Sequence, residues 1–313
     1  MPARSAVRSL TLMTMPALLA LALAACGAAE QPPAEPPGEA ATTRAVSHAR
    51  GETEVPADPQ RVVVLEPVQL DTAVALGETP VGTTVLSEVT GVPAYLGADA
   101  AGIATVGTVP EPSLEKIAAL QPDLILGTES RHSELYDELS RIAPTVFMST
   151  QTDPWPDNVQ LVGRTLGAEA RAQALLDDYR ARCDEIADRY GTEGMTAQLI
   201  RPRNDQLTLY GPRSFAGSTL ECAGFTIPAR DWQNDISIDL SPELVLEAQA
   251  DHVFVTAVDP SDESAIPPAV AAVRAESFPQ LHLVDRSFWI TGVGPRGGMA
   301  VLDDIERILS ARR

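Results

Sequence analysis

The chain has 313 residues, of which 44% are hydrophobic and 21% are charged, and this length and composition suit a folded protein with more than one compact unit. Its formal net charge of −20 comes without any basic run, which excludes nucleic acid as an expected partner. The bulk charge does not exclude an anionic ligand, because screening acts over about 8 Å at physiological salt, but such a ligand would need arginines placed beside it.

Residues 1–25 are typical of a secretory signal, because Arg4 and Arg8 precede a short apolar run. The run leads into Leu-Ala-Ala-Cys, which resembles the bacterial lipobox, so we expect lipidation at Cys26. Residues 26–41 follow as a proline-rich tether without aromatic residues, which we expect to be disordered. These segments predict an extracytoplasmic protein that is lipid-anchored to the outer face of the bacterial cell membrane.

An N-terminal lobe is predicted over residues 42–167. It begins with a hairpin over 43–56 that turns at Arg50-Gly51, and strands then alternate with helices. The predicted strands are 61–65, 80–85, 123–128 and 145–149, and the predicted helices are 68–76, 114–120 and 133–143. Such alternation predicts a mainly parallel, doubly wound sheet.

A long helix over residues 168–190, bracketed by glycines, is predicted to connect this lobe to a C-terminal lobe over 191–313. In the second lobe we expect strands at 197–202, 207–212, 252–257, 281–285 and 288–291, and helices at 218–225, 241–250 and 299–310. The fold class is therefore α/β, with two Rossmann-like lobes joined by a single interlobe helix.

A short helix-then-strand phrase occurs once in each predicted lobe, as SLEKIAALQPDLIL from Ser113 and as SPELVLEAQADHVF from Ser241. Both serines are predicted to cap their helices, and a glutamate in the first turn, Glu115 or Glu243, is favoured by the helix dipole. Capping explains a glutamate in either place, but not its presence in both lobes.

Three other patterns in the sequence could indicate a function or a cross-link. Ser113 and Lys116 match the Ser-x-x-Lys of penicillin-recognising enzymes, but Lys116 is the only lysine, so the required Lys-Thr-Gly strand is absent. The glycines of GVGPRG at 292–297 lack the rest of a dinucleotide-binding unit, although free amides beside Arg296 could favour an anionic ligand group. Cys183 and Cys222 could form a disulfide or remain two buried thiols.

From about Thr43 to Ile308 the chain resembles the ferric-siderophore substrate-binding lipoproteins of ABC importers, within the class that has two Rossmann-like lobes and one rigid connecting helix. The phrases that carry the resemblance include HARGETEVPADPQRVVVLEPVQLDTAVALGETPVGT, LYGPRSFAGSTLECAGF and FWITGVGPRGGMAVLDDIE, together with the repeated phrase and the lipobox. It implies a monomer that is not an enzyme, has no intrinsic cofactor and binds an Fe(III)-siderophore complex whose iron is held by the siderophore rather than by protein ligands. It also implies docking of Glu115 and Glu243 onto arginines of an ABC permease dimer, which works with its ATPase.

The same resemblance places the ligand in a cleft between the lobes, at the carboxyl ends of the strands. It implies contacts from Arg131 in the first lobe and from Arg201 in the second, with Tyr210 able to hydrogen-bond a chelate oxygen. Trp155 and Trp232 fall in apparent loops, which favours exposure at the cleft, whereas Trp289 suits a core strand equally well. The candidate ligand contacts are thus Arg131, Arg201, Tyr210, Trp155, Trp232, Trp289 and Arg296.

Two alternative functions stay open from the sequence. Haem or cobalamin could bind the same fold, and haem would require an axial ligand, for which His132 is the candidate. An extracytoplasmic enzyme is the more remote alternative, since no nucleophile–base constellation supports it.

Overall fold

The computed structural model describes residues 42–152, 154–233 and 235–311, so the predicted signal and the whole predicted tether, including Cys26, lie outside the described residues. Within these ranges no helix combines the length and the apolar character needed to cross a bilayer.

The first lobe carries the predicted hairpin and a parallel sheet. The hairpin pairs β1 (Thr43–His48) with β2 (Gly51–Pro56) in antiparallel register. The five-stranded sheet has the order β5-β4-β3-β6-β7, with bounds Ala104–Thr108, Gly82–Val85, Val62–Val64, Leu124–Thr128 and Thr145–Met148. All its pairs are parallel. The predicted strands are present, and β5 is an addition that the apolar pattern missed because its first two residues are exposed.

The second lobe repeats this sheet with one reversed strand. Its order is β10-β9-β8-β11-β12, with bounds Ser237–Leu240, Gln206–Tyr210, Ala197–Arg203, His252–Ala257 and Leu281–Asp285. Only β9 runs antiparallel to its neighbours. The strand predicted over 288–291 is wrong, since Arg286–Trp289 form helix α9. Asp285 explains the difference, because its carboxylate accepts a hydrogen bond from the Ser287 amide at 2.7 Å and starts a helical turn.

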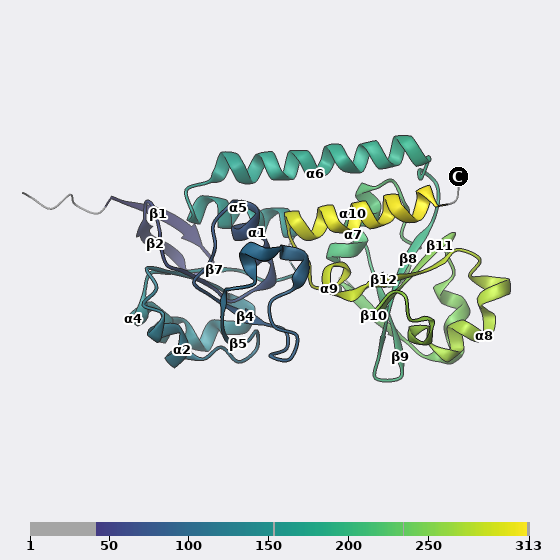
Figure 1. Cartoon of the computed structure of the whole chain (residues 1–313), viewed down its shortest axis with the longest axis horizontal. Coiled ribbons are helices and arrows are strands. Elements are labelled where there is room, and N and C mark those ends of the chain that lie inside the picture. The colour runs from purple at the N-terminus through teal and green to yellow at the C-terminus, as the bar shows by residue number, and fades with distance from the viewer. Residues whose placement is uncertain (1–41, 153, 234, 312–313) are drawn as a thin grey trace, which may run out of the picture. The chain divides into compact units, whose positions relative to one another are not determined.

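Helices cover both faces of each sheet (Figure 1). In the first lobe α1 (Pro67–Ala75) and α5 (Trp155–Thr165) pack on one face, and α2 (Leu114–Ala119) and α4 (Tyr136–Ile142) pack on the other. In the second lobe α7 (Phe215–Cys222) and α10 (Pro295–Ser310) lie opposite η4 (Pro242–Ala248) and α8 (Pro268–Ser277). Short helical segments complete the chain: Ala94–Leu96, Ala98–Ala100, α3 (Glu129–His132), Ser133–Leu135 and Glu263–Ala265.

The repeated phrase forms equivalent elements in the two lobes. The first copy is α2 followed by β6, and the second is η4 followed by β11, each strand lying next to the central strand of its sheet. Ser113 caps α2 as predicted, since its hydroxyl accepts a hydrogen bond from the Lys116 amide at 3.3 Å. Ser241 also takes the predicted N-cap position, but its hydroxyl makes no capping hydrogen bond. It donates instead to the Glu243 carboxylate, and η4 is a kinked 3-10 segment.

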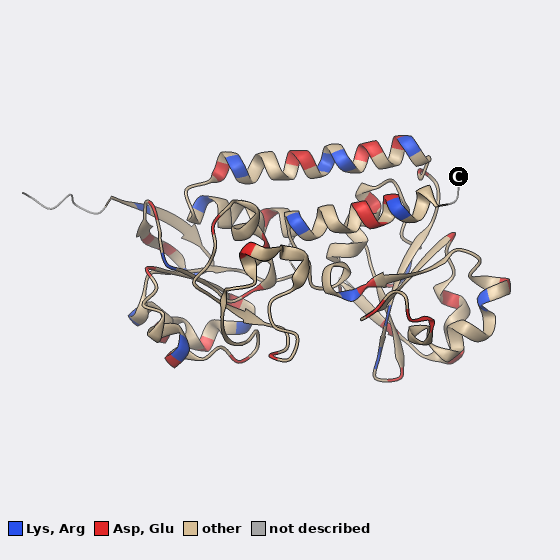
Figure 2. Cartoon of the chain, viewed as in Figure 1, with Lys and Arg blue, Asp and Glu red and all other residues tan. Residues whose placement is uncertain are grey.

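Helix α6 (Glu169–Tyr190) packs against α5 and α10, and Gly191 ends it in the left-handed conformation. Charged residues of both signs line α6 (Figure 2). Arg182 of this helix pairs with Glu185 and with Asp303 of α10. A disulfide joins Cys183 of α6 to Cys222 of α7, which decides between the two readings of these cysteines. One hydrophobic cluster runs without interruption from β1 through α6 to α10, so a continuous core joins the lobes.

Candidate functional site

The carboxyl ends of β3 and β6 form the switch point of the first sheet, since the chain leaves β3 toward β4 on one side while β6 lies on the other. Open α/β sheets bind ligands in this position. Glu66 lies two residues after the end of β3, at the N-cap of α1, and Arg131 lies in α3 directly after β6. The two residues therefore meet where the topology favours a ligand.

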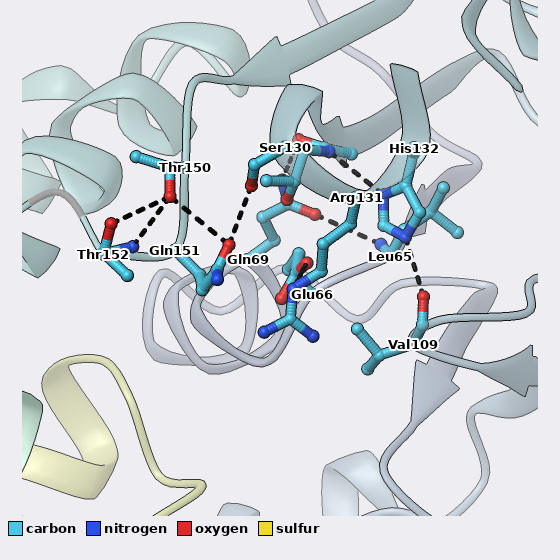
Figure 3. Close-up of polar contacts among 12 residues, drawn as sticks. Leu65, Glu66, Gln69, Val109, Ser130, Arg131, His132, Thr150, Gln151 and Thr152 are labelled. Atoms are coloured by element: carbon cyan, nitrogen blue, oxygen red, sulfur yellow. Dashed lines mark hydrogen bonds and ion pairs between the residues drawn. The ribbon is translucent and has the colours of Figure 1, made fainter. Parts of the chain in front are cut away.

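Arg131 forms an ion pair with the buried carboxylate of Glu66. Its Nε lies 3.3 Å from Oε1 of Glu66, and the two side chains are 35% and 2% exposed. Figure 3 shows both terminal nitrogens of the guanidinium on the side away from Glu66, and within the described residues neither has a partner. A guanidinium with this edge free can donate two parallel hydrogen bonds to a planar oxyanion.

Burial governs the charge of Glu66. Loss of solvent raises the pKa of its carboxyl to about 7, against the lowering effects of the Arg131 charge and of Thr128. Glu66 Oε1 and the Thr128 hydroxyl are both buried without a hydrogen-bond partner in the described part of the chain. Near neutral pH, protonation of Glu66 would therefore leave the charge of Arg131 uncompensated.

In the second lobe the structure brings Arg201 and Tyr210 together. Arg201 lies near the carboxyl end of β8, the central strand, and its Nη1 donates to the Tyr210 hydroxyl at 3.4 Å. Both residues are half-buried. Because β8 occupies the place in its sheet that β3 occupies in the first, Arg201 and Arg131 lie at corresponding edges of the two sheets.

Two of the three tryptophans are core residues, which corrects the expected loop position of Trp155. Trp155 begins helix α5, is 6% exposed and makes edge contacts with Tyr179 and Phe215. Trp289 is fully buried on helix α9, stacks on Phe254 and donates from Nε1 to Asp304 at 2.9 Å.

Trp232 alone of the three remains half-buried. Its ring lies so close to Gly211, the residue after Tyr210, that a Cβ there would approach within 2.7 Å. It is therefore the tryptophan that stays available to a ligand.

The anion site expected at the start of α10 is already filled from within the protein. The Arg296 and Gly297 amides donate to the Asp71 carboxylate of α1 at 2.8 and 2.9 Å, and the Tyr95 hydroxyl adds a third bond at 3.0 Å. The Arg296 guanidinium donates to the backbone carbonyls of Leu96 and Val74. Arg296 therefore connects the two lobes through hydrogen bonds within the protein, whereas the sequence led us to expect a contact with the ligand.

Asp71 is a buried clamp between the lobes. Burial raises the pKa of its carboxyl to about 7, although the two amides and Tyr95 favour the ionised form. Gly294 allows the close approach, because a Cβ at that position would lie 2.4 Å from the carboxylate.

His132 does not suit an axial haem ligand. Its Nδ1 accepts a hydrogen bond from the Thr128 amide at 3.2 Å, and its Nε2 lies 2.8 Å from the Val109 carbonyl. The ring is fully buried, and this burial lowers its pKa. Both ring nitrogens are thus engaged by backbone groups around the loop that carries Arg131. His132 is therefore not available as the axial ligand that the haem alternative requires.

Glu115 and Glu243 are exposed, on α2 and on η4. These elements cover corresponding faces of the two sheets, opposite the faces that pack toward α10. Two exposed leucines, Leu244 and Leu246, lie beside Glu243. The structure therefore places the two acids on equivalent elements with exposed side chains.

An open hollow of about 660 Å³ lies at the amino ends of β8, β11 and β12. There the Asp251 carboxylate accepts hydrogen bonds from the amide and the hydroxyl of Thr196. The hollow is at the opposite end of the sheet from Arg201. Among the described residues no group of three or more His, Cys, Asp or Glu side chains is arranged to hold a metal ion.

Two doubly wound sheets that share a core with one long helix define the class III type of substrate-binding protein. The chain belongs to the periplasmic binding protein family, whose model matches residues 62–270.

Several relatives are named for iron chelates. The chain is 31% identical to the probable siderophore-binding lipoprotein YfiY of Bacillus subtilis, over 84% of this chain and 87% of that protein. It is 33% identical to the achromobactin-binding periplasmic protein of Dickeya dadantii, over 80% and 86%. The solved structure of Staphylococcus aureus SirA complexed with staphyloferrin B superposes with a TM-score of 0.72 at 30% identity, covering 86% of this chain and 99% of that one.

The sequence did not single out the two buried acids Glu66 and Asp71. Glu66 carried a signal, because a charged residue directly after a buried parallel strand lies at the ligand edge of such a sheet. Asp71 carried none, since its partners Arg296 and Gly297 lie 225 and 226 residues away.

Proposed function

We propose that this protein captures a ferric siderophore between its lobes and delivers it to the permease of an ABC importer. The pair of arginines at corresponding sheet edges carries the proposal, because each lobe offers a cation to the oxygens around chelated iron. The names of the relatives supply the chelate class.

The finer parts of this proposal concern the membrane. A lipid on Cys26 holds the protein at the outer face of the cell membrane, and Glu115 and Glu243 dock onto the permease dimer. Their exposure on equivalent elements supports a two-fold arrangement of contacts with a dimeric partner. The iron stays within its chelate, so the protein acts by recognition without catalysis.

Intrinsic tryptophan fluorescence tests the proposal. We expect saturable quenching by at least one member of a ferric panel: staphyloferrin B, achromobactin, citrate, a hydroxamate and a catecholate. Substitution Trp232→Phe should remove much of the signal change, because Trp155 and Trp289 are buried. Haem and cobalamin serve as controls, and binding of either in place of every ferric chelate would contradict the proposal.

A further inference from the structure

Hydrogen bonds fix the backbone that carries the Glu66 carboxyl. The backbone carbonyl of Glu66 accepts hydrogen bonds from the Gln69 and Leu70 amides at the start of α1, both at 3.1 Å. The Gln69 side chain accepts from the Leu65 amide at 3.2 Å and donates to the Gly127 carbonyl at 2.7 Å. The loop after β3 is thereby tied to the strand that leads into Arg131, as Figure 3 shows in part.

The contact uses one particular edge of the guanidinium. Glu66 lies against Nε, whereas the two terminal nitrogens point away from it (Figure 3). A carboxyl in this place limits rotation of the Arg131 side chain and aims its bidentate edge outward. Outer contacts of this kind commonly orient the groups that touch a ligand.

We propose that Glu66 is a proton-linked positioning residue, which aims Arg131 at an anionic ferric chelate and takes up a proton as that chelate binds. The proposal rests on the proposed function and adds to it a mechanism by which pH controls capture.

Among the groups that face Glu66, Arg131 is the charged one that acts on the ionisation of its carboxyl. From α3 Arg131 faces it, and from β6 the Thr128 hydroxyl does so. Two other titratable groups lie on α3: Glu129 pairs with Arg50, and His132 has both ring nitrogens engaged by backbone groups and a pKa that burial lowers. On its own helix, Gln69 is neutral and fully engaged by Leu65 and Gly127.

The sign of the effect follows from the position of the anion. In the free protein the pKa of Glu66 is about 7. An anion on the terminal nitrogens of Arg131 disfavours the carboxylate and raises this pKa further. Binding is therefore strongest below pH 7, where Glu66 is already protonated, and weakens as pH rises toward the higher pKa of the complex. Coulomb repulsion over roughly 6 Å at an effective dielectric constant near 20 corresponds to about a 10- to 100-fold change in affinity.

The test is a series of dissociation constants from pH 5.5 to 8.5 for the tightest-binding member of the ferric panel. Wild type is compared with Glu66→Gln, which keeps an oxygen in place to lie against Arg131 Nε but cannot titrate, and with Glu66→Leu, which removes that oxygen. Glu129→Gln is the matched control, because Glu129 lies two residues from Arg131 and pairs with Arg50 instead. Ratios between variants at each pH remove the titration of the chelate itself.

We expect wild type and Glu66→Gln to agree at pH 5.5 and to diverge about 10-fold or more by pH 8.5, with Glu66→Gln the tighter. Glu66→Leu should be weak at every pH, and Glu129→Gln should follow wild type. Parallel profiles for wild type and Glu66→Gln would overturn the inference but leave the proposed function standing. Absence of chelate binding by wild type at every pH would overturn both.

Discussion

Reversal of both Glu115 and Glu243 to arginine is expected to abolish ferric-chelate uptake by cells and to leave chelate affinity unchanged within about twofold. Both acids are exposed on α2 and η4, and within the described residues no hydrogen bond or ion pair joins either of them to Arg131 or Arg201. Like charges brought together at an interface cost several kcal/mol, and two such sites should reduce uptake by at least about 100-fold. Uptake of iron-55 as the ferric chelate measures this directly.

A matched control separates docking from general surface charge. Glu138 on α4 and Glu276 on α8 are exposed acids on helices that cover the same two sheet faces. Substitution of both Glu138 and Glu276 by arginine changes the net charge by the same amount as substitution of Glu115 and Glu243. It should leave uptake near the wild-type level. Normal transport by the Glu115 and Glu243 double variant would refute the docking role.

Replacement of Cys183 and Cys222 by alanine is expected to lower the free energy of unfolding by about 4 kcal/mol. The disulfide closes a loop with a sequence separation of 39, and the chain-entropy relation gives this value for such a loop. The bond ties α6 to α7, so its loss also frees the connecting helix from the second lobe. For a protein of this size the melting temperature should fall by roughly 7–10 °C.

Reduction of the wild-type protein supplies the control for this prediction. A strong reductant should move the wild-type denaturation curve toward that of the double alanine variant and should not affect the variant itself. The residual difference between the two measures the packing of the buried Cys183 side chain. Coincident curves for wild type and variant would show that the cross-link adds no stability.

The fold was largely accessible from the sequence because its signals are local. Apolar runs such as Leu124–Thr128, each bounded by a proline or glycine, predicted the buried strands. The recurrence of one phrase predicted two related lobes, and the bracketing glycines predicted the connecting helix. Failures occurred where a side chain overrode the pattern, as Asp285 does when it turns an apolar strand-like segment into helix α9.

The site was less accessible because its contacts join distant parts of the chain. Free amides at the start of α10 predicted an anion, but only the structure shows that Asp71 is that anion. Trp155 stands between prolines and so resembles a loop residue, yet it fills the junction of α5, α6 and α7. The position of Arg131 followed from chain order, whereas the buried carboxyl behind it required the pairing of β3 with β6.

The most direct measurement of the central claim is chelate affinity in variants that remove one cation from each lobe. Arg131→Met and Arg201→Met should each weaken binding of the preferred ferric chelate by at least about 10-fold, since each removes a charge-assisted contact. The double variant should bind none, while Arg141→Met, on the exposed surface of α4, should bind as wild type does. Undiminished affinity in both single variants would contradict capture of the chelate between the two lobes.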